Sequence, residues 1–348
     1  MSTLLDGTFD PKIIIGRSAE REAVDAAIRQ RGRRCFYFEG FGGIGKTYLL
    51  RSVVDALQQM ENLPQQVLHT NIIDLYHVRY HQPLALLGEL ANRIRADGPE
   101  DSPDPFAGFG QAVNAYYRSR GSTNERSSYQ NVEQAFLIDY TQLAQRYRIL
   151  VTIDTLEKLD FSIDEQIDEQ DNAPDRFDQW LFELLEQLPN TVVILAGRPR
   201  PRQNQLLEIT FGPACKIFQL QPFTQYETRA YTEQIIRQSR RAITLEADEY
   251  DRIFAITQGE PIPLILYLSY LLAQPELREL PNVFDDNDNR EVLHTAFRDT
   301  VIGELATQAP EIHGLLEYAV FLRKGIDAQI LHQLEPNTPE AELRERLG

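Results

Sequence analysis

The sequence is poor in the residues on which several classes of protein depend, and cysteine is the first of them. Cys35 and Cys215 are its only cysteines, and each lies in an apolar, strand-like run. Two cysteines exclude a disulfide framework, so we expect both to be buried free thiols. The longest apolar run, residues 262–272, is too short to cross a bilayer, and the N-terminal sequence shows no basic region followed by an apolar core. We therefore expect a cytoplasmic protein that does not enter a membrane.

Positive charge is also scarce. The chain carries 35 Lys and Arg against 52 Asp and Glu, which gives a formal net charge of −17. This balance argues against non-specific nucleic-acid binding, because phosphate contacts need a basic surface. It does not exclude ATP, which a local group of amides, one lysine and Mg²⁺ can hold.

His77 and His81 lie four residues apart with no third ligand nearby, and we expect packing or surface roles for them rather than a zinc site.

Strand-like and helix-like segments alternate along a chain of 348 residues, which predicts an α/β protein of two or three domains. Strands are predicted at 35–39, 66–72, 148–153, 191–196 and 215–220. The helical patterns between them are typical of a parallel sheet wrapped by helices. After residue 221 the pattern is wholly helical. Helices are predicted there near 225–239, 247–257 and 262–273.

The segment between the second and third predicted strands is unusually long. We expect a helix from about residue 74 to 95, and then a stretch from 97 to 128 that is rich in Gly, Ser, Pro, Asp and Asn. This composition predicts a loop, either a tolerated surface insertion or a mobile lid, and the insertion is the simpler interpretation. A later acidic run, 160–175, also predicts a solvated loop.

The most informative motif lies at residues 40–47, which match the phosphate-binding pattern G-x-x-x-x-G-K-[ST]. It follows a predicted strand and precedes a helical pattern, which is the context that the motif requires. Its glycines let the backbone wrap closely round phosphates, Lys46 would reach the β- and γ-phosphates, and the Thr47 hydroxyl would bind Mg²⁺. The predicted nucleotide-binding residues here are Gly40, Gly42, Gly43, Ile44, Gly45, Lys46, Thr47 and Tyr48.

Two carboxylates and an arginine follow other predicted strands. Asp154 ends the third strand and is predicted to hold Mg²⁺ together with Thr47, directly or through a water. Glu157 lies within reach of the same site, where it would orient or deprotonate an attacking water; an acidic residue near a helix start is the alternative. Arg198 ends the fourth strand and would contact the γ-phosphate, with Arg200 as the competing candidate. We take Asp154, Glu157 and Arg198 as the predicted catalytic residues.

These motifs resemble, in the expected order, those of the STAND class of signal-transducing phosphate-loop ATPases. That class is related to AAA+ proteins and includes NB-ARC, NACHT and MalT-like regulators. Besides the phosphate loop, four segments carry the resemblance: residues 15–17 with Glu20 ("GRE"), 153–157 ("DTxE"), 195–198 (the sensor strand) and 257–264 ("TGGxPLAL"). Gln258 stands where a glycine is usual, and Pro263 replaces a small residue.

The resemblance implies ATP or ADP with Mg²⁺ as cofactors. It implies that Ile15, Gly16 and Arg17 lie on the adenine side of the nucleotide and that Pro261 packs against the base. It also implies that the sheet is AAA+-like.

Three domains are expected on this basis: a nucleotide-binding domain at 1–220, a helical bundle at 221–285 and the start of a winged-helix domain at 286–348. The family's late histidine motif, which reads the β-phosphate of ADP, has no match before Gly348. Because no terminal cap or closing strand precedes that residue, we expect the chain to be a C-terminally truncated fragment.

The favoured function is a nucleotide-operated signalling switch, in which ADP holds a closed state and ATP favours an open, homo-oligomeric one, with slow hydrolysis. A protein effector or sensor is expected beyond residue 348 or in another protein. The alternative is a DNA-acting AAA+ ATPase with a winged helix, against which the net charge and the lack of a basic recognition helix near 326–334 argue. A phosphoryl-transferring kinase lacks an evident acceptor site.

Overall fold

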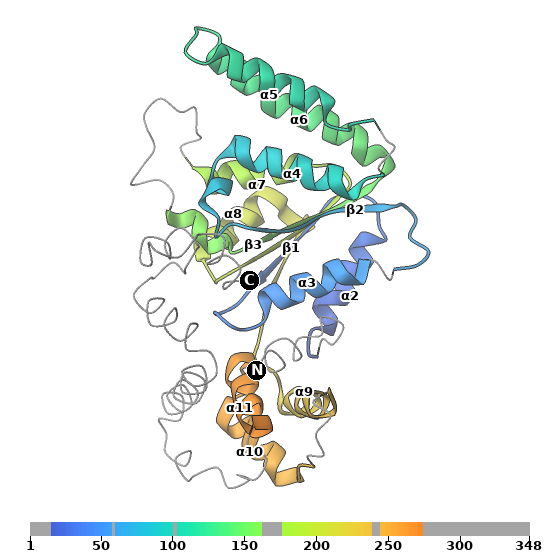
Figure 1. Cartoon of the computed structure of the whole chain (residues 1–348), viewed down its shortest axis with the longest axis vertical. Coiled ribbons are helices and arrows are strands. Elements are labelled where there is room, and N and C mark those ends of the chain that lie inside the picture. The colour runs from blue at the N-terminus through green and yellow to red at the C-terminus, as the bar shows by residue number, and fades with distance from the viewer. Residues whose placement is uncertain (1–14, 58–59, 100–102, 162–175, 239–243, 274–348) are drawn as a thin grey trace, which may run out of the picture. The chain divides into compact units, whose positions relative to one another are not determined.

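The computed structural model describes residues 15–57, 60–99, 103–161, 176–238 and 244–273 (Figure 1). The chain divides into two compact units, Met1–Tyr231 and Thr232–Gly348. The predicted winged-helix segment and most of the predicted acidic loop lie outside the described residues.

Five parallel strands form the centre of the first unit, and all five strands predicted from the sequence are confirmed. Their order across the sheet is β2-β3-β4-β1-β5. Every residue of β3 and β4 is buried, which is why both strands read as uninterrupted apolar runs rather than as alternating patterns. The strands are β1 (Arg34–Glu39), β2 (Val67–Asp74), β3 (Arg148–Asp154), β4 (Thr191–Gly197) and β5 (Cys215–Gln219).

The strand order brings three sequence motifs to one edge of the sheet. β4 lies between β1 and β3, and both pairings are parallel. Because parallel strands end at the same edge, the loop after β1, Asp154 at the end of β3 and Arg198 after β4 are neighbours there. The sheet thus collects residues that are more than 150 positions apart in the chain.

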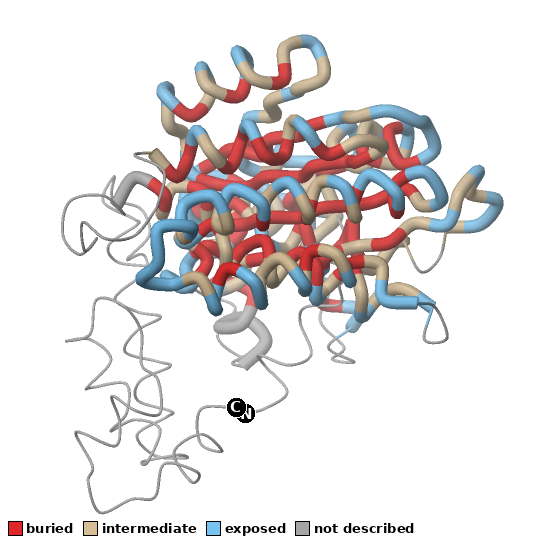
Figure 2. Tube along the Cα trace, turned by 90° about the horizontal axis from the view of Figure 1, so that it is seen from above, coloured by how far each residue is buried: buried red, intermediate tan, exposed pale blue. Residues whose placement is uncertain are grey.

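Helices cover both faces of the sheet (Figure 1). Figure 2 shows the buried positions along the sheet and on the inner sides of these helices. Alternate residues of β1 enter different cores: Phe36 and Phe38 pack with α2 and α3, whereas Cys35 and Tyr37 lie in the core of the opposite face. One face is covered by α2 (Ser18–Ile28) and α3 (Lys46–Leu57), and the other by α4 (Pro83–Asp97), α7 (Phe177–Gln187) and α8 (Pro201–Phe211).

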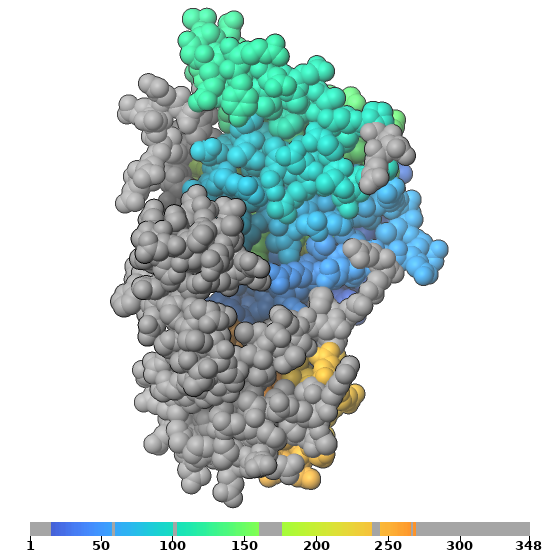
Figure 3. Space-filling view, in the orientation of Figure 1, coloured from blue at the N-terminus to red at the C-terminus, as the bar shows by residue number. Residues whose placement is uncertain are grey.

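The loop predicted for residues 97–128 is wrong. That stretch contains α5 (Ala107–Ser119) and the start of α6 (Glu125–Arg146), which together form a helical hairpin. The hairpin extends beyond α4 in Figure 1 and forms the green end of the surface in Figure 3. Phe106 stacks on Phe136 with ring centroids 5.5 Å apart, and both side chains are fully buried. This aromatic packing outweighs the low helix propensity of the intervening Gly and Ser residues.

The helix expected from residue 74 begins later than predicted. β2 continues to Asp74, a short 3-10 turn η1 (Val78–His81) follows, and α4 starts only at Pro83. Proline suits the first position of a helix because its fixed φ is helical and its missing N–H would have no partner there. Two further 3-10 turns are η2 (Leu156–Phe161) and η3 (Gly212–Ala214).

The three helices predicted between residues 225 and 273 are confirmed in the part of the chain that the structure describes. Across the described residues, no helix combines the length and the apolar character that a bilayer span requires. The three helices are α9 (Gln225–Gln238), which begins in the first unit, and α10 (Ala247–Thr257) and α11 (Pro261–Ala273), which belong to the second.

Candidate functional site

The loop at residues 40–47 joins β1 to α3 and turns tightly. Gly43 and Gly45 have φ values of 82° and 95°, a left-handed conformation that glycine adopts at little cost. A Cβ added to Gly40 would lie only 2.6 Å from Cγ2 of Ile44. The shape of the loop therefore requires glycine at positions 40, 43 and 45, and the loop leads directly into the first turn of α3.

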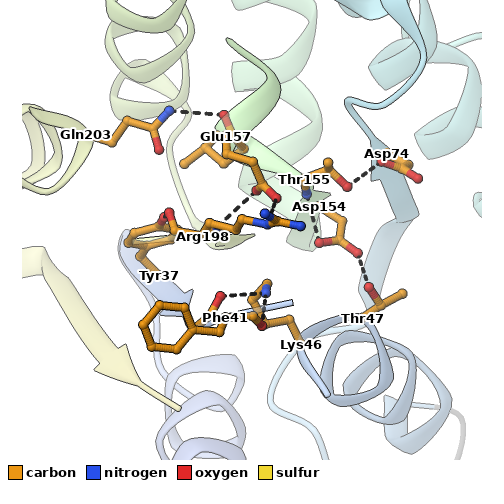
Figure 4. A network of polar contacts seen from close by, with 12 residues as sticks. Tyr37, Phe41, Lys46, Thr47, Asp74, Asp154, Thr155, Glu157, Arg198 and Gln203 are labelled. Carbon is orange, nitrogen blue, oxygen red and sulfur yellow. Dashed lines mark hydrogen bonds and ion pairs between the residues drawn. The ribbon is translucent and has the colours of Figure 1, made fainter. Parts of the chain in front are cut away.

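Lys46 is the first residue of α3, and its side chain turns back over the loop (Figure 4). Nζ donates to the carbonyl oxygens of Gly40 at 2.7 Å and Phe41 at 2.9 Å. Burial lowers the pKa of this ammonium, while Glu157 and Asp154 act in the opposite direction. The charge lies beside a helix N-terminus, where free N–H groups and the helix dipole favour an anion. The arrangement is suited to a phosphate, which accepts hydrogen bonds more strongly than a carbonyl does.

Thr47 and Asp154, the predicted metal ligands, meet directly. The Thr47 hydroxyl donates to Oδ2 of Asp154 at 2.5 Å, and the backbone N–H of Thr155 donates to Oδ1 at 2.8 Å. Burial raises the pKa of the Asp154 carboxyl, and these two hydrogen bonds oppose that shift. A hydroxyl beside a carboxylate is a set of hard oxygen donors of the kind that Mg²⁺ prefers, so the residues present fit this ion.

Glu157 and Arg198 form an ion pair at the mouth of the loop. The Arg198 backbone N–H donates to Oε2 of Glu157 at 3.0 Å, and the Arg198 Nε lies 3.4 Å from Oε1. The Glu157 side chain is 14% exposed and that of Arg198 is 62% exposed. Arg198 Nη2 lies 3.3 Å from the position of a Cβ built on Gly42. Glu157 and Arg198, predicted after two different strands, therefore contact each other directly beside the phosphate loop.

The first turn of α8 supports this group in a way that sequence reasoning missed. The fully buried Gln203 donates from Nε2 to the Leu156 carbonyl at 3.0 Å, next to Glu157. Asn204 donates from Nδ2 to Oε2 of Glu39, the buried residue that precedes the loop, at 2.8 Å. Only the position of these amides just after the fourth strand could have indicated their role.

Of the three residues predicted on the adenine side, Arg17 is the one tied most clearly to the phosphate loop. It is 7% exposed, and its Nη2 donates to the carbonyls of Ile44 at 3.2 Å and Gln221 at 2.8 Å. Gly16 is left-handed at φ 73°, and a Cβ there would lie 2.6 Å from Oε1 of Glu227. Ile15 is half-buried. The contact between Arg17 and Ile44 places residues 15–17 against the phosphate loop. That these residues contact adenine stays a prediction.

The remaining predicted residues have separate surroundings. Tyr48 is half-buried on α3. Burial raises the pKa of the Tyr231 hydroxyl, and the nearby Tyr48 adds to that shift. Pro261 is buried at the start of α11 in the second unit, and its contact with a nucleotide stays a prediction. Arg200 is the N-cap residue of α8, whereas Arg198 is paired with Glu157.

Comparison with known families gives one match. The profile of the NACHT domain matches residues 34–239, which is more than half of the chain. The matched range contains Lys46, Thr47, Asp154, Glu157 and Arg198. No curated protein sequence matches the chain.

Several solved structures resemble the chain at low sequence identity. The Aeropyrum pernix ORC1 protein in complex with DNA has a TM-score of 0.49 and 13% identity, over 98% of this chain and 84% of that chain. Cdc6p from Pyrobaculum aerophilum has a TM-score of 0.46 and 14% identity, over 79% of this chain and 67% of that chain. Drosophila ORC bound to DNA has a TM-score of 0.44 and 15% identity, over 77% of this chain and 58% of that chain.

Proposed function

The chain belongs to the NACHT domain family of P-loop NTPases, which bind nucleotides, and from this premise we propose that it is a nucleotide-operated signalling switch. It binds ATP or ADP with Mg²⁺, hydrolyses ATP slowly, and assembles into a homo-oligomer when ATP is bound. The observation that carries the proposal is the Glu157–Arg198 ion pair at the mouth of the phosphate loop. A residue able to activate water and a residue able to contact the terminal phosphate are thereby linked to each other.

Binding is assigned to the loop and to its two metal ligands. The N–H groups at the start of α3 and the Lys46 ammonium would hold the β- and γ-phosphates. Thr47 and Asp154 would hold Mg²⁺, which when bound neutralises charge on the phosphate oxygens. Asp154 is buried and anchored on both carboxylate oxygens, so it offers a fixed rather than a flexible ligand.

Hydrolysis is assigned to Glu157. One of its carboxylate oxygens would accept the proton of a water whose oxygen attacks the γ-phosphorus, while the bond to the β-phosphate oxygen breaks. In the structure both carboxylate oxygens face Arg198, one across a hydrogen bond and the other across the ion pair. Glu157 must give up one of these contacts before that oxygen can accept a proton from water, which is a physical reason to expect slow turnover.

Discrimination between ATP and ADP is assigned to Arg198. A triphosphate would compete with Glu157 for the guanidinium, because both are anionic acceptors within its reach. A charge-assisted hydrogen bond contributes about 1.5–3 kcal/mol. A near-complete shift between two states needs roughly 5.5 kcal/mol of differential affinity, so contacts from other residues must contribute as well.

The Arg198→Ala variant is expected to bind ATP about 10- to 100-fold more weakly than the wild type and to bind ADP within about threefold. The reason is that only ATP offers the terminal phosphate that this guanidinium would contact. Isothermal titration of each nucleotide in the presence of Mg²⁺ measures the effect. Arg202→Ala, a change to an exposed arginine in the first turn of α8, serves as the matched control. Equal weakening of both nucleotides by Arg198→Ala would contradict the assignment.

The proposed output involves other molecules. We assign the switch to the cytoplasm, with a protein effector or sensor as its partner beyond residue 348 or on another chain. Extraction of the nucleotide that co-purifies with the protein, followed by chromatography, tests the resting state. Bound ADP supports the switch, and recovery of neither ADP nor ATP from protein that also fails to bind them when added contradicts it.

A further inference from the structure

Thr155, the residue after Asp154, has a backbone conformation that threonine rarely adopts. Its φ is 63°, in the left-handed region where a β-branched side chain crowds the backbone. Such a conformation costs on the order of 1–3 kcal/mol and persists only where surrounding contacts hold it. The other described non-glycine residues with positive φ are of types that tolerate it better, namely Asn62, Asn71, Asn190 and Gln258.

The contact that holds Thr155 comes from the neighbouring strand. Its hydroxyl donates to Oδ1 of Asp74 at 2.6 Å, and the same oxygen accepts the backbone N–H of Tyr76 at 2.9 Å. Asp74 ends β2 and lies opposite Asp154 in the strand register. The backbone N–H of Leu75 donates to the Asp154 carbonyl at 3.1 Å, which ties the two strand ends together. Figure 4 shows Thr155 linked to both carboxylates, through its hydroxyl to Asp74 and through its backbone N–H to Asp154.

The turn at Thr155 determines two features of the site. Its backbone N–H is one of the two donors that fix the Asp154 carboxylate, the other being the Thr47 hydroxyl. The chain then enters η2, which carries Glu157 two residues later. A change of φ at this one residue would therefore move both the proposed metal ligand and the proposed base. The remaining backbone of β3 is fixed by pairing on both sides, with β2 and with β4.

We propose that Asp74 is a positioning residue of the Mg²⁺ site: through the Thr155 hydroxyl it holds that residue in its left-handed conformation and thereby sets Asp154 and Glu157. Asp74 does not coordinate the ion in this account. The inference rests on the proposed function, because it needs Asp154 to be a metal ligand. A purely structural role for Asp74 would instead affect only the stability of the fold.

A double-mutant cycle tests the coupling, with Mn²⁺ binding to the ADP-loaded full chain measured by electron paramagnetic resonance. Asp74→Ala is expected to weaken Mn²⁺ binding about tenfold, because the strain at residue 155 is then no longer offset. In a Thr155→Gly background the same change is expected to alter binding less than about twofold, because glycine adopts positive φ without strain.

Two substitutions of Thr155 itself separate the hydroxyl from the shape of the side chain. Thr155→Val keeps the branch and removes the donor, and it is expected to weaken Mn²⁺ binding about as much as Asp74→Ala. Thr155→Ser keeps the donor and is expected to stay within about twofold of the wild type. Asp97→Ala is the matched control. Asp97 is another aspartate whose carboxylate accepts a hydrogen bond, from the backbone N–H of His69 on β2, and it lies away from the loop. Asp97→Ala should leave Mn²⁺ binding unchanged.

The outcomes separate this inference from the function on which it rests. If the wild type binds ADP and Mn²⁺ but Asp74→Ala and Thr155→Val bind Mn²⁺ equally well, the positioning role is overturned and the proposed function stands. The positioning role is also overturned if the losses of Mn²⁺ affinity caused by Asp74→Ala and by Thr155→Gly simply add in the double variant. If the wild type binds no Mn²⁺ with nucleotide, the proposed metal site itself is wrong. Should Asp74→Ala fail to fold by circular dichroism, the Thr155→Val and Thr155→Ser pair decides the question alone.

Discussion

The Lys46→Ala variant is expected to bind both ATP and ADP about 100-fold more weakly than the wild type, and it is the single change expected to weaken nucleotide binding most. Nζ of Lys46 lies over the loop, within hydrogen-bonding distance of the Gly40 and Phe41 carbonyls. Its removal takes away the positive charge closest to the proposed β- and γ-phosphate positions. Isothermal titration with each nucleotide, in the presence of Mg²⁺, measures the loss.

A matched lysine elsewhere in the sheet domain shows whether the effect is local. Lys216 on β5 is exposed and lies over the ring of Phe218 at 4.4 Å, so Lys216→Ala removes the same charge without touching the loop. It should bind both nucleotides as the wild type does. Unchanged ATP affinity in Lys46→Ala, in protein with wild-type circular dichroism, would show that the nucleotide does not bind in the loop at residues 40–47.

The Glu157→Gln variant is expected to lose ATP hydrolysis by about 100- to 10,000-fold while binding ATP at least as tightly as the wild type. Glutamine keeps the size of the side chain and its hydrogen-bonding oxygen, but it cannot take a proton from water at neutral pH. It also frees Arg198 from an ion pair whose distance is 3.4 Å, which favours contact between this arginine and a triphosphate. Release of phosphate in single-turnover conditions measures hydrolysis, and titration measures binding.

A second glutamate provides the control for that change. Glu183 is an exposed residue of α7 whose carboxylate accepts a hydrogen bond from Gln179. Glu183→Gln makes the same chemical substitution on the surface and should hydrolyse ATP at the wild-type rate. Hydrolysis at the wild-type rate in Glu157→Gln would remove Glu157 from the mechanism and leave its pairing with Arg198 as a structural contact.

Much of the sheet and of the phosphate site could be predicted from the sequence because both depend on local patterns. β3 and β4 are buried on both faces, so a continuous apolar run marks each of them. Asp154 ends β3, Arg198 directly follows β4, and Lys46 follows the loop that leaves β1; parallel strands bring such positions together. Once the strand order was assumed, the meeting of Glu157 and Arg198 could also be expected.

The rest depended on contacts between distant residues. The α5–α6 hairpin is stabilised by Phe106 packing on Phe136, thirty positions away, whereas the local composition of the segment favours a loop. The role proposed for Asp74 depends on one hydrogen bond to Thr155 and on a backbone angle. The sequence does not predict a positive φ at residue 155, because a β-branched residue such as threonine prefers negative φ.

The measurement that tests the switch most directly is the molar mass of the full chain by light scattering, first with ADP and Mg²⁺ and then with a non-hydrolysable ATP analogue and Mg²⁺. Both samples must be shown to be saturated by titration beforehand. The account predicts a monomer with ADP and a larger assembly of defined mass with the analogue, and a loss of that assembly in Arg198→Ala. The same mass in both saturated samples would contradict it.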